Sequence, residues 1–185
     1  KLNRIMKIIA TDRLLLSPML ASDSPQVVDW RNSSHVHSVS YRQTTDLITI
    51  SSHLNWFNST RLNRIDYIIS LKSSAFPIGS VAYRFTSSNY LDQSSAELSK
   101  YIGEKSHLRK GYAYEATKAW LDFGFNCLGF DVIYARTSTF NHANIRLNQK
   151  LGFSMVDNKN LEPIEEWGNS WHLMKILKSE FFETA

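Results

Sequence analysis

Cysteine is almost absent from this chain of 185 residues, and long hydrophobic runs are missing. Cys127 has no partner for an internal disulfide bond, and because it falls on the apolar stripe of a predicted helix we expect it to be buried. No stretch approaches the ~20 apolar residues that cross a membrane, and residues 5–10 are too short for the core of a signal peptide. We therefore expect a cytoplasmic protein without a membrane partner.

A concentrated basic run is also missing, although the net charge is +4. This charge favours an acidic partner. Lys100, Lys105, Arg109 and Lys110 gather in one segment, whereas the other basic residues are scattered. Because nucleic-acid readers usually show a basic run or a known motif, we expect a small phosphate-bearing ligand and no nucleic-acid partner.

The length of the chain supports one domain over residues 1–185 with a substantial buried core. Its 43% hydrophobic and 21% charged residues are typical of a globular protein. No internal repeat or low-complexity tract is present. Residues 1–5 precede Met6, which is a candidate for the native start.

Hydrophobic spacing predicts a mixture of helices and strands. We expect a helix over residues 25–31, and a second helix that Asp46 caps and that buries Leu47, Ile50, Leu54 and Phe57. A longer helix starts after Gly111 and ends at Gly129. Strands are expected at residues 11–18, 67–71, 78–85, 96–102, 132–137 and 171–177, and loops at residues 72–77, 86–95 and 157–169.

Residues 101–116 form a pattern that is typical of a phosphate-binding turn: an apolar strand, a short basic turn and the start of an amphipathic helix. The first N–H groups of a helix have no carbonyl partner and lie at the positive end of its dipole, so they can bind an anion. Gly111 lets the backbone come close to it. The turn has neither the Gly-Lys-Ser/Thr ending of nucleoside-triphosphate loops nor the three glycines of dinucleotide loops.

Two segments resemble the hallmarks of the GNAT family of N-acetyltransferases. Residues 108–113 are similar to the acetyl-coenzyme A loop of that family, Arg/Gln-x-x-Gly-x-Gly/Ala, although Leu108 departs at the first position. Residues 141–153 resemble the second hallmark, which begins Asn-x-x-Ser/Asn and ends Lys-Leu-Gly-Phe. Residues 11–18 are similar to the first strand of many members. The two hallmarks stand in the family order, and the resemblance covers nearly the whole chain.

The resemblance implies an α/β fold, with a mixed, mainly antiparallel sheet of about seven strands and helices on both faces. It also implies acetyl-CoA as co-substrate and no metal. Backbone N–H groups at Tyr101 and Ile102 would stabilise the oxyanion. Asn141 and Asn144 would contact the cofactor, although Asn141 is also a good helix N-cap. The phosphates would lie on Leu108, Arg109, Lys110, Gly111, Tyr112 and Ala113.

Acetyl transfer to an amine requires a base for the amine and an acid for the leaving thiolate. Glu97 is the leading candidate base, because the family often places a carboxylate there; the alternative is a strand glutamate that points to solvent. Many members use a tyrosine as the acid, but Asn148 takes that place here. Either another hydroxyl, such as Tyr134 or Ser138, serves as the acid, or water assists the thiolate.

The acceptor site is predicted from Trp30, Arg31, His53 and Trp56. Their setting resembles the nucleotide-aminosugar N-acetyltransferases of the pseudaminic acid pathway, in which aromatic rings can stack on a base or sugar and arginine can pair with a diphosphate. The alternative for both tryptophans is core packing. The chain also resembles ribosomal-protein N-terminal acetyltransferases, so a peptide N-terminus, a polyamine or another small amine stays open as the acceptor.

Other classes of function have less support in the sequence. His35 and His37 have a spacing that would place both on one side of a strand, but no third metal ligand is near. The chain has no Gly-x-Ser-x-Gly motif of a hydrolase. A non-catalytic CoA-binding regulatory module is the main alternative to an enzyme, and a homodimer is left open.

Overall fold

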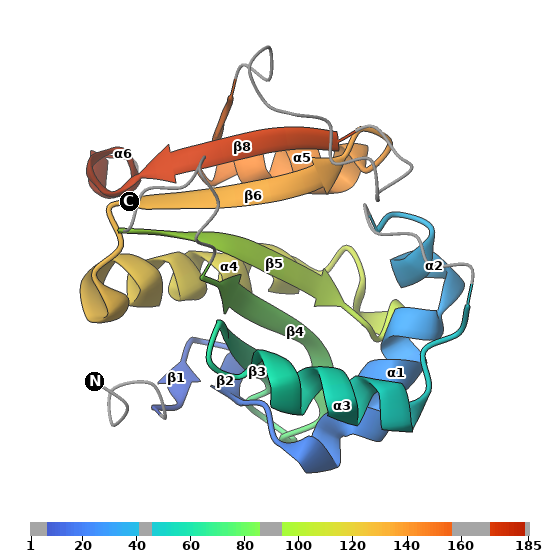
Figure 1. The fold of residues 1–185 in the computed structure, drawn as a ribbon. Helices are drawn as coiled ribbons and strands as arrows, with labels where there is room; N and C mark the ends of the chain where they lie inside the picture. The colour runs from blue at the N-terminus through green and yellow to red at the C-terminus, as the bar shows by residue number, and fades with distance from the viewer. Residues whose placement is uncertain (1–6, 41–45, 86–93, 157–170, 184–185) are drawn as a thin grey trace.

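A mixed sheet of eight strands organises the part of the chain that the structure, a computed structural model, describes: residues 7–40, 46–85, 94–156 and 171–183. The order across the sheet is β1-β2-β3-β4-β5-β6-β8-β7 (Figure 1). The predicted mixed sheet is confirmed, with the short β1 as an additional strand. In chain order the strands are β1 (Ile9–Ala10), β2 (Leu14–Pro18), β3 (Arg64–Leu71), β4 (Pro77–Arg84), β5 (Ser95–Ile102), β6 (Val132–Ser138), β7 (Ser154–Met155) and β8 (Trp171–Leu177).

One strand pair differs from all the others in direction. Each neighbouring pair is antiparallel except β5 and β6, which are parallel. A parallel pair needs a crossover connection, and helix α4 (Tyr112–Asp122) supplies it. The N-terminus of α4 therefore follows the carboxyl end of β5, where the sequence predicts the anion-binding turn.

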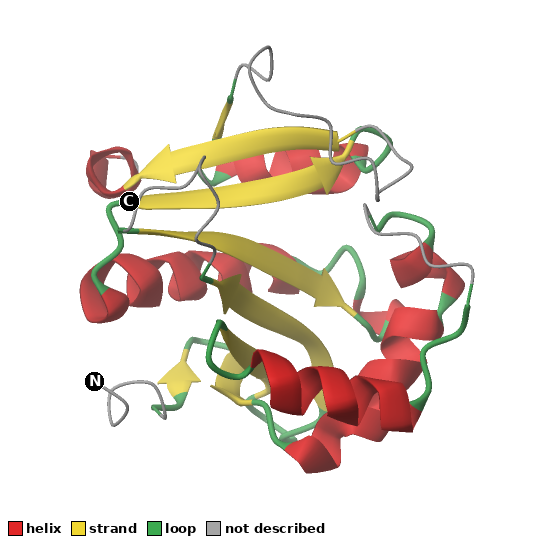
Figure 2. Ribbon diagram, viewed as in Figure 1, coloured by secondary structure: helices red, strands yellow, loops and turns green. Residues whose placement is uncertain are grey.

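Helices cover both faces of the sheet (Figure 2). On one, the α1 face, α1 (Ser24–Asn32) and α3 (Ile50–Thr60) enclose a small apolar cluster that includes Trp30, Phe57 and Ile68. On the other, the α4 face, α4 and α5 (His142–Lys150) cover the larger core. The shorter helices are η2 (Ala21–Asp23), α2 (Ser34–His37), η3 (Lys105–His107) and α6 (Lys178–Glu183).

The second predicted helix is present and buries Phe57 as predicted, but its cap and the burial of Leu47 and Ile50 were predicted wrongly. Thr49 caps α3 by accepting a hydrogen bond from the Ser52 N–H at 3.1 Å, so the helix starts later than a cap at Asp46 would allow. Leu47 lies before the helix and is 77% exposed. The buried side of α3 carries His53 and Phe57 and packs against α1. Residue spacing alone does not identify this side, because the position of the neighbouring helix decides it.

Cys127 is exposed, contrary to the prediction. It lies in η4 (Phe123–Leu128), a π-helical segment that continues α4. A π-helix has more residues per turn than an α-helix, so the apolar stripe of α4 does not continue at the same spacing. The segment buries Phe123, Gly124 and Phe125 instead. Gly129 then ends the helix in the left-handed conformation with φ 79°, as predicted.

The remaining elements lie close to their predicted positions. The helix over residues 25–31 is confirmed as α1, and the strand over residues 171–177 as β8. Residues 72–76 form the predicted turn between β3 and β4. The loop predicted at residues 157–169, and most of the one at residues 86–95, lie outside the described residues. None of the described helices has the length and apolar character to span a membrane.

Candidate active site

Strands β5 and β6 separate partway along their length. Residues 95–98 of β5 pair with residues 132–135 of β6, and the pairing stops there. On its other side β5 stays paired with β4 as far as Ile102. In the described part of the chain, the edge of residues 99–102 that faces β6 therefore has no strand partner. An unpaired strand edge can bind an extended ligand that carries amide groups.

The turn after β5 combines exposed cations with an unusual backbone. Arg109 has φ 61° and Gly111 has φ 82°, both in the left-handed region. Alternation of this kind turns neighbouring N–H groups toward one side and makes an anion-binding concavity. The first intrahelical bond of α4 runs from the Glu115 N–H to the Gly111 carbonyl at 3.1 Å, which leaves the preceding N–H groups directed at the turn. The predicted anion site is thus supported by the backbone geometry.

Two residues just before β2, Thr11 and Arg13, hold this turn in place. Arg13 donates from Nε to Glu115 at 2.6 Å and from Nη1 to the Lys110 carbonyl at 3.0 Å, and its guanidinium lies 4.6 Å from the centre of the Tyr112 ring. The Thr11 hydroxyl donates to the same Glu115 at 2.6 Å. These bonds outweigh desolvation and lower the pKa of the Glu115 carboxyl. Glu115 therefore holds the turn in place, beyond the simple complement to the helix dipole that the sequence indicates.

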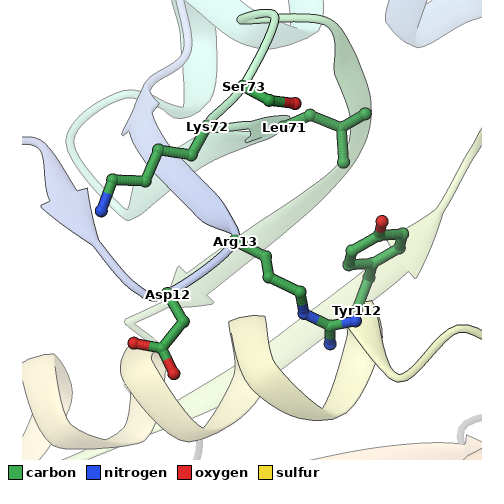
Figure 3. A pocket seen from close by; sticks show the side chains of 6 residues that line it. All are labelled: Asp12, Arg13, Leu71, Lys72, Ser73 and Tyr112. Atoms are coloured by element: carbon green, nitrogen blue, oxygen red, sulfur yellow. The ribbon is translucent and has the colours of Figure 1, made fainter.

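A cavity of about 390 Å³ lies next to Arg13 (Figure 3). The side chains of Arg13 and Tyr112 lie next to each other at the start of α4, and Lys72 points away from them (Figure 3). The cavity is lined by Asp12, Arg13, Leu71, Lys72, Ser73 and Tyr112.

A network of side chains starts at the N-terminus of α5. Asn141 accepts the Asn144 N–H at 3.1 Å, so it is an N-cap. The amide of Asn144 donates to the Thr137 hydroxyl at 2.9 Å, and the amide of Asn148 donates to the same oxygen at 3.4 Å. The structural roles of Asn141 and Asn144 are therefore clear, and their contact with the cofactor stays a prediction.

Lys100 joins this network from β5. Its Nζ donates to the Asn148 Oδ1 at 2.6 Å, and burial lowers its pKa to about 7. From the sequence, Lys100 is recognisable only as part of a basic cluster. Its position on the buried side could have been inferred from the strand pattern. Side chains two residues apart lie on the same side of a strand, and Ala96, Leu98 and Ile102 are apolar.

The opposite face of the same strands carries a charged row. Glu97 of β5 lies between Arg84 of β4 and Tyr134 of β6 in the strand register. Glu97 is 3% exposed, and its Oε2 lies 2.6 Å from the Arg84 Nη2 and 3.6 Å from the Arg136 Nε. The carboxylate thus does not point to solvent. It orients two arginines, and its role as a base stays a prediction.

Tyr134 lies on the α1 face with Glu97, since directly paired residues of parallel strands share a side. Asn148 and Lys100 lie on the other face, so the sheet separates Tyr134 from the place that the family tyrosine would take. Ser138, at the end of β6, is 3% exposed. The role of Tyr134 as an acid stays a prediction.

Trp30 is 3% exposed and belongs to the small cluster under α1. Its Nε1 donates to the Glu104 Oε1 at 2.7 Å, and its ring packs edge-on against Tyr101. It also lies so close to Gly103 that a Cβ there would be 2.1 Å from the ring. Trp30 therefore positions the end of β5, in agreement with the core-packing alternative. Trp56 is partly exposed and has the Arg64 guanidinium 4.9 Å from its ring centre.

Arg31 and His53 lie on the α1 face beside the end of β5. His53 is 3% exposed, and its Nδ1 is 3.0 Å from the Ser24 hydroxyl. Burial, helped by the positive charge of Arg31, lowers the pKa of His53. Burial raises the pKa of the Tyr101 phenol to about 12, against the opposing effect of Arg31. Among the described residues, no carboxylate forms an ion pair with Arg31.

The two histidines of residues 35–37 do not form the strand pair that their spacing suggests. They lie in the short helix α2, where residues two apart point to different sides. Within the described ranges, no three His, Cys, Asp or Glu side chains are close enough together to hold a metal ion.

Comparisons with known proteins agree with this geometry. The family model described as an acetyltransferase (GNAT) domain matches residues 13–154. The chain is 28% identical over 159 residues to an uncharacterized N-acetyltransferase, p20, of Bacillus licheniformis. This match covers 80% of this chain and 83% of that protein.

Several solved structures share the fold at low sequence identity. An acetyltransferase (GNAT family) from Bacillus anthracis has a TM-score of 0.75 at 20% identity and covers 94% of this chain and 100% of its own. A spermidine N-acetyltransferase from Vibrio cholerae, in complex with CoA and spermine, has a TM-score of 0.77 at 20% identity and covers 93% and 99%. A putative ribosomal-protein-serine acetyltransferase from Vibrio cholerae has a TM-score of 0.70 at 19% identity and covers 92% and 97%.

Proposed function

Because this chain belongs to the GNAT family and is an acetyl-CoA-dependent N-acetyltransferase, we propose that its acceptor is a primary amine that carries an anionic group, with a nucleotide-linked aminosugar as the leading candidate. The observation that carries the proposal is the sign of the charge around the end of β5. Within the described part of the chain, the α1 face presents four arginines beside the end of β5, Arg31, Arg64, Arg84 and Arg136, against the carboxylates Asp66, Glu97 and Glu104.

These carboxylates are already engaged, and Glu104 accepts a hydrogen bond from the Trp30 Nε1 at 2.7 Å. Asp66 forms an ion pair with Arg64 at 2.8 Å, and Glu97 forms one with Arg84 at 2.6 Å. Arg31 is left without such a partner among the described residues, at the entrance to the same face. A guanidinium group binds phosphate through two parallel hydrogen bonds, which suits the diphosphate of a nucleotide sugar.

The cofactor fits the opposite side of the site. The turn at residues 108–113 offers N–H groups and cations for a pyrophosphate, and the unpaired edge of residues 99–102 offers N–H and C=O groups for the two amides of a pantetheine arm. We therefore place acetyl-CoA between β5 and β6, with its phosphates at the N-terminus of α4.

The chemistry then proceeds by direct attack in a ternary complex. The acceptor amine loses a proton to Glu97, and its nitrogen attacks the thioester carbon. Backbone N–H groups at Tyr101 and Ile102 stabilise the oxyanion that forms on the carbonyl oxygen. The intermediate collapses, the carbon–sulfur bond breaks with its electrons on sulfur, and the thiolate takes up a proton.

A polyamine acceptor would require the opposite charge on this face. The spermidine enzyme from Vibrio cholerae shares the fold, but a polycation would be repelled by arginines. A peptide N-terminus is the second candidate, because an α-amine has a pKa of about 8 and needs less help from a base. We also place the protein in the cytoplasm, where acetyl-CoA is available to such an enzyme.

A panel of amines tests the acceptor class. The panel contains a UDP-linked 4-aminosugar, the same aminosugar without its nucleotide, spermidine and a peptide with a free N-terminus. We expect kcat/KM for the nucleotide-linked sugar to exceed that for the bare sugar by 10-fold or more, equivalent to ~1.4 kcal/mol. Faster turnover of spermidine would contradict the proposal, and faster turnover of the peptide would establish the second candidate. Acetyl-CoA binding without turnover of any amine would favour a regulatory module.

A further inference from the structure

We propose that Lys100 is the general acid of acetyl transfer, and that its ammonium group gives a proton to the coenzyme A thiolate as the carbon–sulfur bond breaks. This inference rests on the proposed placement of acetyl-CoA between β5 and β6. Lys100 would thereby perform the task for which the sequence offers no suitable hydroxyl at position 148.

The position of Lys100 follows from the strand register. The last residue of β5 that pairs with β6 is Leu98, and Lys100 is the next residue with the same orientation. Lys100 therefore lies on the α4 face, at the first place where the two strands have separated. Opposite it on β4 is Val81, which belongs to the apolar core. A thioester placed between the separated strands would therefore lie next to this side chain.

Within the described part of the chain, the only hydrogen bond of the Lys100 side chain goes to a neutral group. Its Nζ donates to the Asn148 Oδ1 at 2.6 Å. An ammonium group has three N–H donors, so two are still available for a sulfur atom. The amide of Asn148 donates in turn to Thr137 and Met174, which fixes its oxygen toward the lysine. Asn148 thus positions a proton donor although it cannot act as an acid itself.

The acidity of Lys100 is suited to the step. Burial, without a nearby carboxylate, lowers its pKa to about 7. An alkyl thiol has a pKa of about 8.5, so transfer of a proton from this ammonium to a thiolate is favourable. The thiolate becomes a thiol, Lys100 becomes a neutral amine, and a proton from solvent restores the ammonium after the products leave.

Few other titratable groups face this point. From β8, His172 lies beside Thr137 in the register, and from α4, Tyr114 carries the Lys150 ammonium 4.7 Å from its ring centre. β6 presents Thr137 on this side, and β4 presents Val81 and Tyr83, whose phenol donates to the Trp120 carbonyl at 2.8 Å. Glu97 and its arginines lie on the other face of the sheet. A pH effect that disappears on substitution of Lys100 is therefore assigned to that lysine.

The test compares Lys100→Met, which keeps the length of the side chain without the proton, with Lys100→Arg, which keeps the charge but holds its proton too tightly to donate it. Lys118→Met, on the exposed side of α4, is the matched control. We expect kcat to fall roughly 100-fold in both Lys100 variants, at the lower end of the range for general acid catalysis. The alkaline limb of the wild-type rate profile should disappear with them.

A second measurement does not depend on turnover. The ultraviolet absorbance of the thiolate gives the pKa of the thiol of free coenzyme A bound to the enzyme. We expect Lys100→Arg, whose side chain stays charged, to hold this pKa lower than Lys100→Met by roughly one unit or more, as a neighbouring cation does. Melting curves show that each variant is folded, and Lys100→Gln replaces Lys100→Met if the latter is not.

The outcomes separate the two proposals. An equal thiol pKa in Lys100→Arg and Lys100→Met, with tight coenzyme A binding in both, would show that position 100 is remote from the sulfur; it would overturn the role of Lys100 and keep the cofactor placement. A rise in kcat or in acetyl-CoA affinity in Lys100→Met would also overturn it, because Lys100 would then be an obstacle. If Gly111→Glu left the affinity for coenzyme A unchanged, the cofactor placement itself would be overturned.

Discussion

The two faces of β5 are built in different ways. On the α4 face, most of the groups that we propose for the cofactor come from one continuous segment, residues 99–113, in which a strand leads directly into a turn and a helix. On the α1 face, Arg31, Arg84, Glu97 and Arg136 come from four separate elements that only the fold brings together. A local site depends on local sequence, whereas an assembled site depends on strand register. Substitutions on the α1 face should therefore change turnover and the acceptor KM, whereas substitutions in residues 108–113 should change the affinity for acetyl-CoA.

The largest effect is expected at Glu97, the carboxylate of the assembled face. Glu97→Gln should lower kcat by roughly 10²–10⁴ if the carboxylate is the general base, and the loss should shrink as the pH rises and the acceptor amine deprotonates without help. If Glu97 only orients Arg84 and Arg136, the acceptor KM should rise at every pH. Rate profiles over pH for both substrates distinguish these roles.

The next effect concerns the local face. Gly111→Glu would place a carboxylate in the anion site and force a side chain into φ 82°, with its Cβ 3.3 Å from the Arg13 Nη2. We expect acetyl-CoA affinity to fall by about 100-fold or more, ~2.7 kcal/mol, measured by calorimetry. Gly129→Glu is the matched control, because φ there is 79° and no atom lies within 4 Å of a Cβ. Equal affinities in the two variants would contradict the predicted cofactor site.

A smaller effect is expected at Arg31. Arg31→Ala should raise the acceptor KM about 10-fold, the ~1.4 kcal/mol of a charge-assisted contact, and leave the acetyl-CoA KM nearly unchanged. Arg61→Ala removes an exposed arginine at the end of α3 and serves as the control. A loss of thermal stability with both KM values unchanged would mean that Arg31 is structural, and would favour a peptide acceptor.

The smallest effect is on stability. The pKa of Lys100 is about 7 in the folded chain and about 10.4 when unfolded, so between these values the unfolded state binds more protons. The stability of the wild type should therefore rise with pH through this window, and Lys100→Met should lose that rise. The melting temperature of the variant, relative to that of the wild type, should therefore be higher at pH 7 than at pH 10. The change should be roughly 2–4 °C for each kcal/mol that burial of the ammonium costs. An equal difference at both values would contradict the burial of the ammonium.

The sequence predicts the local features well. The basic turn before a helix, the Gly129 stop and the strand over residues 171–177 follow from short-range spacing and are confirmed in the fold. The two segments that resemble the family hallmarks each consist of a turn and the start of a helix. In such segments the backbone itself carries the information, through glycine, helix ends and charge.

The sequence could not predict contacts that depend on packing and register. The bond between Lys100 and Asn148 joins a strand to a helix 48 residues away, and the row from Arg84 to Tyr134 needs the pairing of three strands. The cap of α3 and the exposure of Cys127 were predicted wrongly, because a later cap and a π-helical segment shift the spacing. Long-range pairing decides these positions, and residue type alone does not reveal it.

Hydrogen exchange tests the division between the two faces most directly. Exchange is measured by mass spectrometry with acetyl-CoA alone, before any acceptor is added. We expect slower exchange in peptides that cover residues 99–114 and the start of α5, and no change in those that cover α1 and α3. Protection of α1 and α3 by acetyl-CoA, with none at residues 99–114, would contradict the assignment of the cofactor to the α4 face.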